Sequence, residues 1–223
     1  MGLINFKDNA VTSDGMLRFE EKYFYTVTKR FLDIIGAILG IILTLVVFLA
    51  VSICIKIEDP KGPIIFSQTR VGKNGKKFKM YKFRSMISNA EDQLQHLLDL
   101  NDTTGAMFKM KNDPRVTKVG RFIRKTSIDE LPQFINVIKG DMSLVGPRPP
   151  LEREVEEYTA YQLQRLLVVP GCTGLWQVSG RSTIGFEEMV ELDLFYIKKR
   201  NFLFDFKIIL KTVFVFLGSK NAF

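Results

Sequence analysis

The chain has 223 residues, 46% hydrophobic and 25% charged, which is enough for one well-filled domain with an appendage. Its net charge of +8 indicates a negatively charged partner such as nucleic acid, anionic lipid headgroups or a phosphorylated substrate. Two isolated cysteines exclude a disulfide framework, and a single histidine excludes zinc chemistry and a histidine-activated nucleophile.

A long apolar run near the N-terminus predicts a membrane-associated helix. From Ile34 to Ile55 there are 22 residues without a charge, enough to cross a bilayer. Basic residues flank both ends, including Lys29 and Arg30 before the run and Lys56 after it, so a hairpin with both ends in the cytoplasm satisfies the positive-inside rule. The middle of the run has no Pro or Gly to break a helix. A single span and a re-entrant hairpin both remain open from the residues.

The next segment predicts a β-hairpin followed by a helix. Residues 63–67 and 77–83 have the composition of short strands, and Gly72-Lys-Asn-Gly75 between them is a turn signal. Lysines alternate with apolar residues in the second strand, so one of its faces is basic. Residues 89–100 have leucines at helical spacing and include the only histidine, His96.

Two adjacent carboxylates, Asp129 and Glu130, follow a basic cluster and precede a helix that is expected to begin near Leu131 and to stop at Gly140. A carboxylate at the positive end of a helix is easily kept ionised. Ser127 and Glu130 also have the spacing of a capping box, which would explain Glu130 but not Asp129. A helix cap and an anion-handling site are both compatible with this segment.

Three prolines surround Arg148 and predict a rigid loop, which suits bidentate phosphate recognition but also fits an ordinary connector. Residues 152–167 are expected to form a charged amphipathic helix, and residues 170–182 a glycine-rich loop that contains Arg181. This loop matches neither a Walker A motif nor a dinucleotide-binding motif.

The C-terminal part predicts two helices. In residues 187–199, Asp193 lies among apolar residues and needs a cation or a hydroxyl group as its partner. It is therefore either a member of a structural ion pair or a ligand-binding residue. Residues 201–217 are almost entirely apolar but contain three charges, which favours a helix lying on lipid headgroups over one that spans the bilayer.

The order and spacing of seven motifs resemble the bacterial sugar transferases, the monotopic phosphoglycosyl transferases, over nearly all of residues 29–217. Residues 91–120 and the motif at 174–181 are most similar to the polyprenyl-phosphate hexose-1-phosphate transferases of exopolysaccharide and capsule synthesis. The motifs are Lys29-Arg-Phe-Leu-Asp33, Gln68-Thr-Arg-Val-Gly72, Tyr81-Lys-Phe-Arg-Ser-Met86, Asp113-Pro-Arg-Val-Thr117, Arg124-Lys-Thr-Ser-Ile-Asp-Glu-Leu-Pro-Gln133, Gly140-Asp-Met-Ser-Leu-Val-Gly-Pro-Arg-Pro149 and Pro170 to Arg181.

The resemblance implies transfer of a hexose 1-phosphate from a UDP-sugar, such as UDP-glucose or UDP-galactose, to undecaprenyl phosphate, with release of UMP. Asp129 would be the nucleophile of a covalent intermediate, and Glu130 its metal-side or acid-base partner. Mg²⁺ held by these two carboxylates and the diphosphate would offset the repulsion between carboxylate and phosphate. The other positions that match the family pattern for substrate binding are Lys82, Arg124, Arg148, Arg181 and Asp193.

The expected fold is α+β, a mostly helical membrane-associated domain with a small β-hairpin or sheet, a re-entrant membrane helix and C-terminal interfacial amphipathic helices. The expected divisions are an N-terminal cytoplasmic or interfacial segment 1–28, a re-entrant helix 29–57 and a catalytic domain 58–223 on the cytoplasmic face of the bacterial inner membrane. The Ser-Pro break usual in the family is replaced here by Leu45-Val46. Membrane lipids are expected partners, nucleic acid is not, and a homodimer stays open.

Other classes of protein make different predictions. A membrane-tethered nucleic-acid binder or a scaffold without catalysis would also explain the charge of +8. The aromatic residues, however, lie in apolar runs rather than among the basic residues, where they could stack on bases. A glycosyltransferase that uses the same donor would release UDP, so the nucleotide product separates that class from a phosphoglycosyl transferase.

Overall fold

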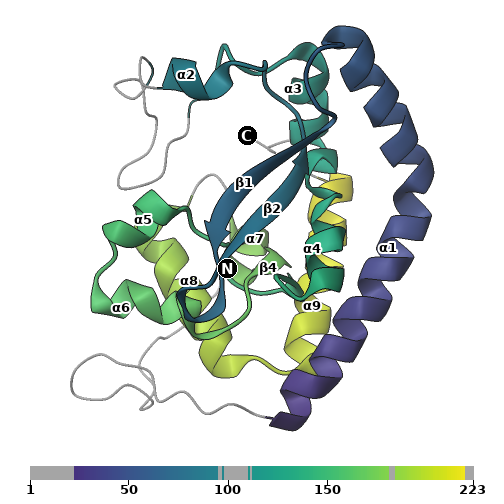
Figure 1. The fold of residues 1–223 in the computed structure, drawn as a ribbon. Helices are drawn as coiled ribbons and strands as arrows, with labels where there is room; N and C mark the ends of the chain where they lie inside the picture. Colours follow the sequence, from purple (N-terminus) through teal and green to yellow (C-terminus); the bar gives the residue numbers. More distant parts are fainter. Residues whose placement is uncertain (1–22, 95–96, 98–109, 111, 181–183, 219–223) are drawn as a thin grey trace.

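The computed structural model describes residues 23–94, 97, 110, 112–180 and 184–218. These residues form a mostly helical fold with two two-stranded sheets (Figure 1). The longer elements are α1 (Tyr23–Glu58), β1 (Ile65–Val71), β2 (Lys77–Phe83), α3 (Lys118–Lys125), α8 (Phe186–Lys199) and α9 (Phe202–Gly218). The shorter ones are α2 (Ala90–Leu94), α4 (Gln133–Lys139), β3 (Ser143–Val145), α5 (Glu152–Glu156), α6 (Ala160–Leu163), β4 (Gly171–Thr173) and α7 (Leu175–Ser179).

Helix α1 runs along one whole side of the domain (Figure 1). With 36 residues it is about 54 Å long, and it is the one helix of the described residues that is long and apolar enough to cross a membrane. Its buried residues, among them Asp33, Ala37, Val51 and Ile55, recur at helical spacing, so one stripe packs on the domain and the rest is exposed. The helix is unbroken from Tyr23 to Glu58, and the re-entrant hairpin stays a prediction.

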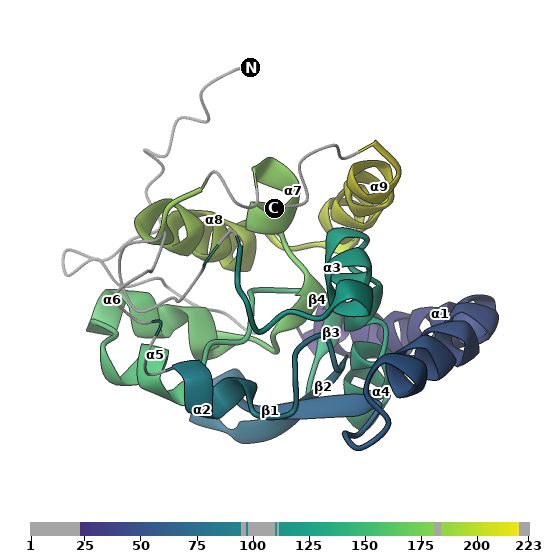
Figure 2. The same ribbon diagram turned by 90° about the horizontal axis from the view of Figure 1, so that it is seen from above.

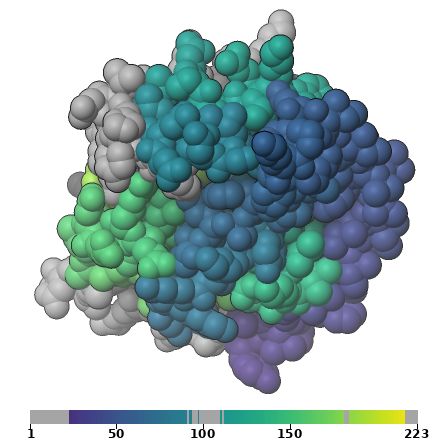
Figure 3. Space-filling model, turned by 45° about the horizontal axis from the view of Figure 1, so that its top comes forward, coloured from purple at the N-terminus to yellow at the C-terminus, as the bar shows by residue number. Residues whose placement is uncertain are grey.

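The predicted β-hairpin is confirmed. Strands β1 and β2 pair antiparallel from Ile65 opposite Phe83 to Val71 opposite Lys77, so the first strand extends four residues beyond its expected end. The hairpin lies at the surface between α5–α6 and α1 (Figure 3). The predicted helix at 89–100 is described as α2 over Ala90–Leu94, and His96 lies outside the described residues.

A second sheet was not predicted. Strands β3 and β4 pair in parallel, with Ser143 opposite Gly171 and Val145 opposite Thr173. The largest apolar core cluster surrounds this pair and is built mainly from α8 and α9. The hydroxyl of Tyr196 in α8 donates to the Val145 carbonyl at 3.1 Å, which fixes α8 against β3.

Helix α4 exposes two large apolar side chains. The predicted helix is confirmed, and it ends at Gly140, whose φ of 87° is the left-handed conformation of a C-terminal cap. Its buried residues are Gln133, Asn136 and Val137, whereas Ile135 and Ile138 are 42% and 40% exposed. Apolar periodicity therefore located the helix, although two of its apolar residues are exposed. Helices α1, α3, α4 and α9, which carry most of the exposed large apolar side chains, lie on one side of the molecule (Figure 2).

The C-terminal helices match their predictions as elements, because α8 and α9 cover the segments expected to be helical. The helix expected over 152–167 is instead split into α5, α6 and a 3₁₀ turn at Gln164–Leu167. The reason is local: the Thr159 hydroxyl accepts a hydrogen bond from the Gln162 backbone amide, and the Gln162 side-chain oxygen accepts one from the Thr159 backbone amide. This capping box starts a new helix at Ala160.

Candidate active site

The two adjacent carboxylates lie in a 3₁₀ turn, Ile128–Glu130, between α3 and α4. Ser127 before this turn has φ 52° and ψ 19°, the left-handed conformation, and its side chain makes no capping hydrogen bond. The capping-box interpretation of Ser127 and Glu130 is therefore wrong. Asp129 is buried, with 7% of the residue exposed, and Glu130 is directed toward a lysine of the hairpin.

That lysine is Lys82 of β2, and it joins the predicted site residues Asp129 and Glu130 into one cluster. Its Nζ donates to Glu130 Oε1 at 2.7 Å and lies 3.9 Å from Asp129 Oδ2. The side chains of Lys82 and Glu130 are 26% and 34% exposed, against 10% for Asp129. An anionic ligand can thus approach the cluster from the Lys82–Glu130 side.

Asn136 fixes the distance between the hairpin and the carboxylates. It is fully buried, and its side chain pairs with β2 as another strand would: it accepts from the Tyr81 amide at 2.9 Å and donates to the Lys79 carbonyl at 2.7 Å. Because Asn136 belongs to α4, which directly follows the carboxylates, this pairing holds Lys82 in register with Asp129.

Burial raises the pKa of the Asp129 carboxyl to about 6. The Lys82 ammonium opposes this rise, the Glu130 carboxylate reinforces it, and Arg124 in the last turn of α3 opposes it more weakly. Arg124 is therefore close enough to act electrostatically on Asp129, and its role in substrate binding stays a prediction. At neutral pH Asp129 is ionised but poorly hydrated, a condition that favours nucleophilic attack.

Arg148 lies in the loop between β3 and α5 and is held by Glu154. Its Nη1 and Nη2 are 3.0 and 3.3 Å from the two Glu154 oxygens, a bidentate pair. The Glu154 side chain is 1% exposed and that of Arg148 is 23% exposed. Burial together with the charge of Arg148 lowers the pKa of Arg70 in β1, whereas the charges of Glu154 and Glu130 raise it. Arg70 therefore lies within electrostatic reach of both the Arg148 loop and the carboxylates.

Asp193, another predicted site residue, is not part of this cluster. Asp193 in α8 forms an ion pair with Arg165, at 2.9 Å to Nε and 2.8 Å to Nη2, and both side chains are 1% exposed. Burial raises the pKa of Asp193 to about 6, and Arg165 opposes the rise. Arg181 lies outside the described residues.

Sequence reasoning assigned no role to Asn136, Glu154, Arg165 or Arg70. Asn136 gave a usable signal, since an amide within an apolar helical segment must find partners when it is buried. Arg70 belongs to the Gln68-Thr-Arg-Val-Gly72 motif, but the residues around it in the sequence did not indicate which groups it would contact. The partners of Glu154 and Arg165 depend on the tertiary fold, so no local pattern reveals them.

Asp129 and Glu130 could supply only part of the coordination shell of a Mg²⁺ ion. The described residues contain no group of three or more His, Cys, Asp or Glu side chains that could hold a metal ion. Protein Mg²⁺ sites commonly use one or two carboxylates together with substrate phosphates, and Asp129 with Glu130 can supply that share. Lys82 already contacts both carboxylates, so a metal ion would share them with this ammonium group.

The profile of the bacterial sugar transferase family matches residues 24–219 of the chain. This range contains α1 apart from its first residue, the hairpin, the carboxylate turn and α9. The match thus covers every element that builds the site.

Individual relatives agree with the family match. The chain is 54% identical over 202 residues to the galactosyl transferase CpsE of Streptococcus agalactiae serotype III, which covers 90% of this chain and 44% of that protein. It is 45% identical over 199 residues to the undecaprenyl-phosphate galactose phosphotransferase of Salmonella typhimurium, covering 87% and 41%. The chain thus spans less than half the length of these relatives. It is 40% identical over 201 residues to the exopolysaccharide production protein ExoY of Sinorhizobium fredii, covering 88% of both chains. The chain therefore belongs to the bacterial sugar transferase family.

Proposed function

We propose that the protein transfers a hexose 1-phosphate from a UDP-sugar to undecaprenyl phosphate and releases UMP, the first membrane step in assembling an exopolysaccharide or other glycoconjugate. The observation that carries the proposal is the cluster in which the poorly solvated Asp129 lies beside Lys82, which itself holds Glu130. The names of the relatives, which include a galactosyl transferase and an undecaprenyl-phosphate galactose phosphotransferase, support the same class of donor and acceptor. They make UDP-galactose the first donor to test, followed by UDP-glucose.

In the first displacement, a carboxylate oxygen of Asp129 attacks the phosphorus that bears the sugar. A bond forms between this oxygen and phosphorus, and the bond from phosphorus to the UMP oxygen breaks, so UMP leaves with the electron pair. Lys82 and Arg124 supply positive charge near Asp129, which reduces the repulsion between the carboxylate and the phosphates. A Mg²⁺ bound to Asp129, Glu130 and the diphosphate would offset more of this charge.

In the second displacement, a phosphate oxygen of undecaprenyl phosphate attacks the same phosphorus atom. The acyl-phosphate bond to Asp129 breaks, and the carboxylate is regenerated as undecaprenyl diphosphate sugar forms. Lys82 stays next to Asp129 during both steps because Glu130 and the hairpin hold it in place. Asp129 suits the role of nucleophile better than Glu130, since Glu130 is engaged by Lys82 at 2.7 Å and is more exposed to water.

We also propose that both ends of α1 lie on the cytoplasmic side of the membrane. Near its start, Lys29 binds Asp205 of α9 at 2.7 Å, and at its end Glu58 accepts from the backbone amides of Lys118 and Val119 at the start of α3. A helix that spanned the bilayer would place these two polar attachments on opposite sides, although they belong to one domain. A re-entrant or interfacial arrangement avoids this.

The exposed apolar side chains support an orientation in which this side of the molecule faces lipid. In α1 and α9 the most exposed large apolar residues include Leu43 at 81%, Leu203 at 73% and Phe214 at 71%. Ile135 and Ile138 of α4 are also exposed, and the helices that carry most of the exposed large apolar residues, α1, α3, α4 and α9, lie on one side of the molecule (Figure 2). Apolar helices that lie in the headgroup region would bring the site to the level of a lipid phosphate.

The product assay tests the reaction directly. Membranes that contain the protein are incubated with undecaprenyl phosphate and, separately, with UDP-galactose, UDP-glucose and UDP-N-acetyl sugars, and the nucleotide released is identified. The proposal predicts UMP with at least one donor, and no UMP from Asp129→Asn. Asp92→Asn is the matched control, because its carboxylate is exposed in α2 and its loss should leave the rate unchanged. Release of UDP would instead indicate a glycosyltransferase, and release of neither nucleotide would indicate a scaffold.

The covalent step has its own test. Mixing the enzyme with the productive UDP-sugar, without acceptor, should raise the intact mass by one hexose phosphate, and peptide mapping should locate the adduct at Asp129. Adding undecaprenyl phosphate should remove the adduct. If UMP is released in full by an enzyme that never gains this mass, direct transfer replaces the two displacements.

Cysteine labelling tests the orientation of α1. Single cysteines are placed at Tyr23 and at Lys61, one at each end of the helix, in a chain with Cys54→Ser and Cys172→Ser. An impermeant maleimide applied to intact cells should label neither position, and both should react after permeabilisation. Labelling of one end only in intact cells would establish a spanning helix.

A further inference from the structure

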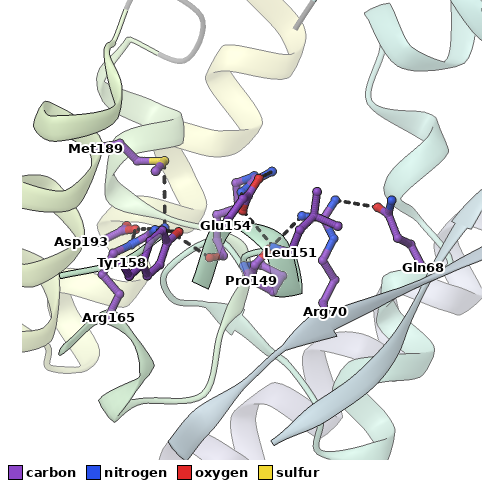
Figure 4. Close-up of polar contacts among 10 residues, drawn as sticks. Gln68, Arg70, Pro149, Leu151, Glu154, Tyr158, Arg165, Met189 and Asp193 are labelled. Atoms are coloured by element: carbon purple, nitrogen blue, oxygen red, sulfur yellow. Dashed lines mark hydrogen bonds and ion pairs between the residues drawn. The ribbon is translucent and has the colours of Figure 1, made fainter. Parts of the chain in front are cut away.

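The loop that carries Arg148 is held from one side by β1. Prolines have no amide hydrogen, so this loop can be tethered mainly through its carbonyl groups. Arg70 donates from Nη1 to the Pro149 carbonyl at 3.1 Å, and the amide of Val71 donates to the Pro150 carbonyl at 3.0 Å. Arg70 is 8% exposed, and its Nη2 is fixed by Gln68 at 2.8 Å (Figure 4). The hairpin therefore anchors the second half of the loop.

The same loop is held from the opposite side by Arg165. Its Nη2 donates to the carbonyl of Arg148 itself at 3.3 Å. The guanidinium of Arg165 is oriented by Asp193, at 2.9 Å to Nε, and by the Tyr158 hydroxyl at 2.6 Å from Nη1 (Figure 4). Because Arg165 and Asp193 are each 1% exposed, the pair is a fixed support within the core.

Glu154 holds both the Arg148 side chain and the backbone at the end of the loop. It binds the Arg148 guanidinium with both oxygens, and one of these oxygens also accepts from the Leu151 amide at 2.9 Å. In this network the three guanidinium groups of Arg70, Arg148 and Arg165 face two carboxylates, so the network has surplus positive charge. Of the three arginine side chains, that of Arg148 is the most exposed.

We propose that Arg70 and the Arg165–Asp193 pair are positioning residues that hold the Pro-Arg-Pro loop from two sides so that Arg148 is presented to the diphosphate of the donor nucleotide. This inference rests on the proposed function, and it changes the role expected for Asp193. Asp193 acts on donor binding through Arg165 and the Arg148 backbone, without touching the substrate.

A double-mutant cycle on Arg70 and Arg148 tests this coupling. Arg70→Met removes the donor to Pro149 while keeping an apolar stem, Arg70→Lys restores a charged donor, and Arg148→Met removes the guanidinium that contacts the donor nucleotide. For each full-length variant, the Kd for UDP is measured by calorimetry without acceptor, and KM and kcat are measured by UMP release. The Kd measurement does not depend on turnover.

Arg70→Met should raise the Kd for UDP and the KM for the UDP-sugar by about 10-fold, the effect of one charge-assisted hydrogen bond, and should leave kcat within about 3-fold. Arg70→Lys should recover most of the loss. In the Arg148→Met background, Arg70→Met should add less than about 2-fold, because the residue through which Arg70 acts is gone. Equal effects in both backgrounds would overturn the proposal, as would an unchanged Kd for UDP in Arg70→Met.

Hydrogen exchange tests the Asp193 side of the network. Asp193→Asn should speed amide exchange at Arg148 and Leu151 at least 10-fold relative to the wild type, because the loop loses one support. Val190→Ala is the matched control: Val190 is fully buried in the same helix and belongs to the apolar core cluster. Equal acceleration of amide exchange in both variants would show that Asp193 contributes only to the general stability of the core, and it would refute the positioning role.

The outcomes separate this inference from the proposed function. If the wild type binds UDP but releases no UMP with any donor, the proposed reaction fails, while the cycle on Kd still decides the roles of Arg70 and Arg148. If UMP is released but the cycle is additive, the reaction holds and the positioning role fails. If the wild type does not bind UDP, both are refuted.

Discussion

Replacing Asp129 by asparagine should stabilise the fold while abolishing UMP release. Burial raises the pKa of this carboxyl from 3.8 to about 6, and the difference corresponds to up to about 3 kcal/mol of folding free energy. Asparagine has nearly the same shape and no charge to desolvate. The native enzyme would therefore keep a destabilising group at the position where the chemistry requires it.

The pH dependence follows from where the proton is bound. Below pH 3.8 the carboxyl is protonated in the folded and unfolded chain, and it contributes no penalty. As the pH rises toward 6, the unfolded chain loses the proton first, so the wild type loses stability relative to Asp129→Asn. Above about pH 6.5 both states are ionised, and the difference between the two proteins should be constant at its largest value.

Thermal unfolding in detergent at pH 4.5, 6 and 8 measures this difference. A gain of up to about 3 kcal/mol corresponds to a Tm higher by up to about 6 to 12 °C for a chain of this size at pH 8, with a smaller gain at pH 4.5. Asp92→Asn, at an exposed position in α2, should change Tm little at any pH. A Tm for Asp129→Asn that equals or falls below that of the wild type at pH 8 would refute the desolvation argument.

Other predictions test the geometry around the carboxylates. The rate of UMP release at low donor concentration should fall below pH 6, since protonated Asp129 cannot attack phosphorus, and a pH–rate profile measures this. Asn136→Leu leaves two backbone groups of β2, the Tyr81 amide and the Lys79 carbonyl, without their hydrogen-bond partner. It should therefore lower the free energy of unfolding by about 2 to 4 kcal/mol in urea titrations and reduce kcat. Gly120→Ala would place a Cβ 2.0 Å from the Ser85 carbonyl oxygen and should cost roughly 3 kcal/mol or more by thermal unfolding. Ser127→Gly should raise Tm slightly, since glycine adopts φ 52° without strain, whereas Ser127→Val should lower it.

Elements with strong local signals were predictable from the sequence. The hairpin at Gly72–Gly75 and the end of α4 at Gly140 depend on residues that adopt positive φ, and α8 and α9 depend on long apolar periodicity. The parallel pairing of β3 with β4 gave no such signal, because each strand has three residues and the partners are distant in sequence. Periodicity located α4, but Ile135 and Ile138 are exposed, and the sequence carried no signal for this exposure.

The positions of some site residues could be predicted from the sequence, and those of others could not. Asp129, Glu130 and Lys82 are brought together, in agreement with the family motifs that named them. Asp193 was also named by a motif, yet it lies in the core with Arg165. A motif preserves a residue type without saying whether the side chain touches substrate or supports another residue that does, and only the contacts separate these two cases.

Two segments of this chain with the same capping-box spacing show what a local pattern leaves undecided. Thr159 and Gln162 form a capping box, and Thr159 has the extended conformation, φ −68° and ψ 164°, that an N-terminal cap requires. Ser127 and Glu130 have the same separation, but Ser127 is left-handed and Glu130 reaches Lys82 of a distant strand. A cap satisfies backbone amides close by, whereas Glu130 is held by an ammonium group that also faces a buried carboxylate. The second arrangement leaves Asp129 poorly solvated and next to positive charge, and burial raises its pKa above the ordinary value. This combination favours a reactive site over a structural one.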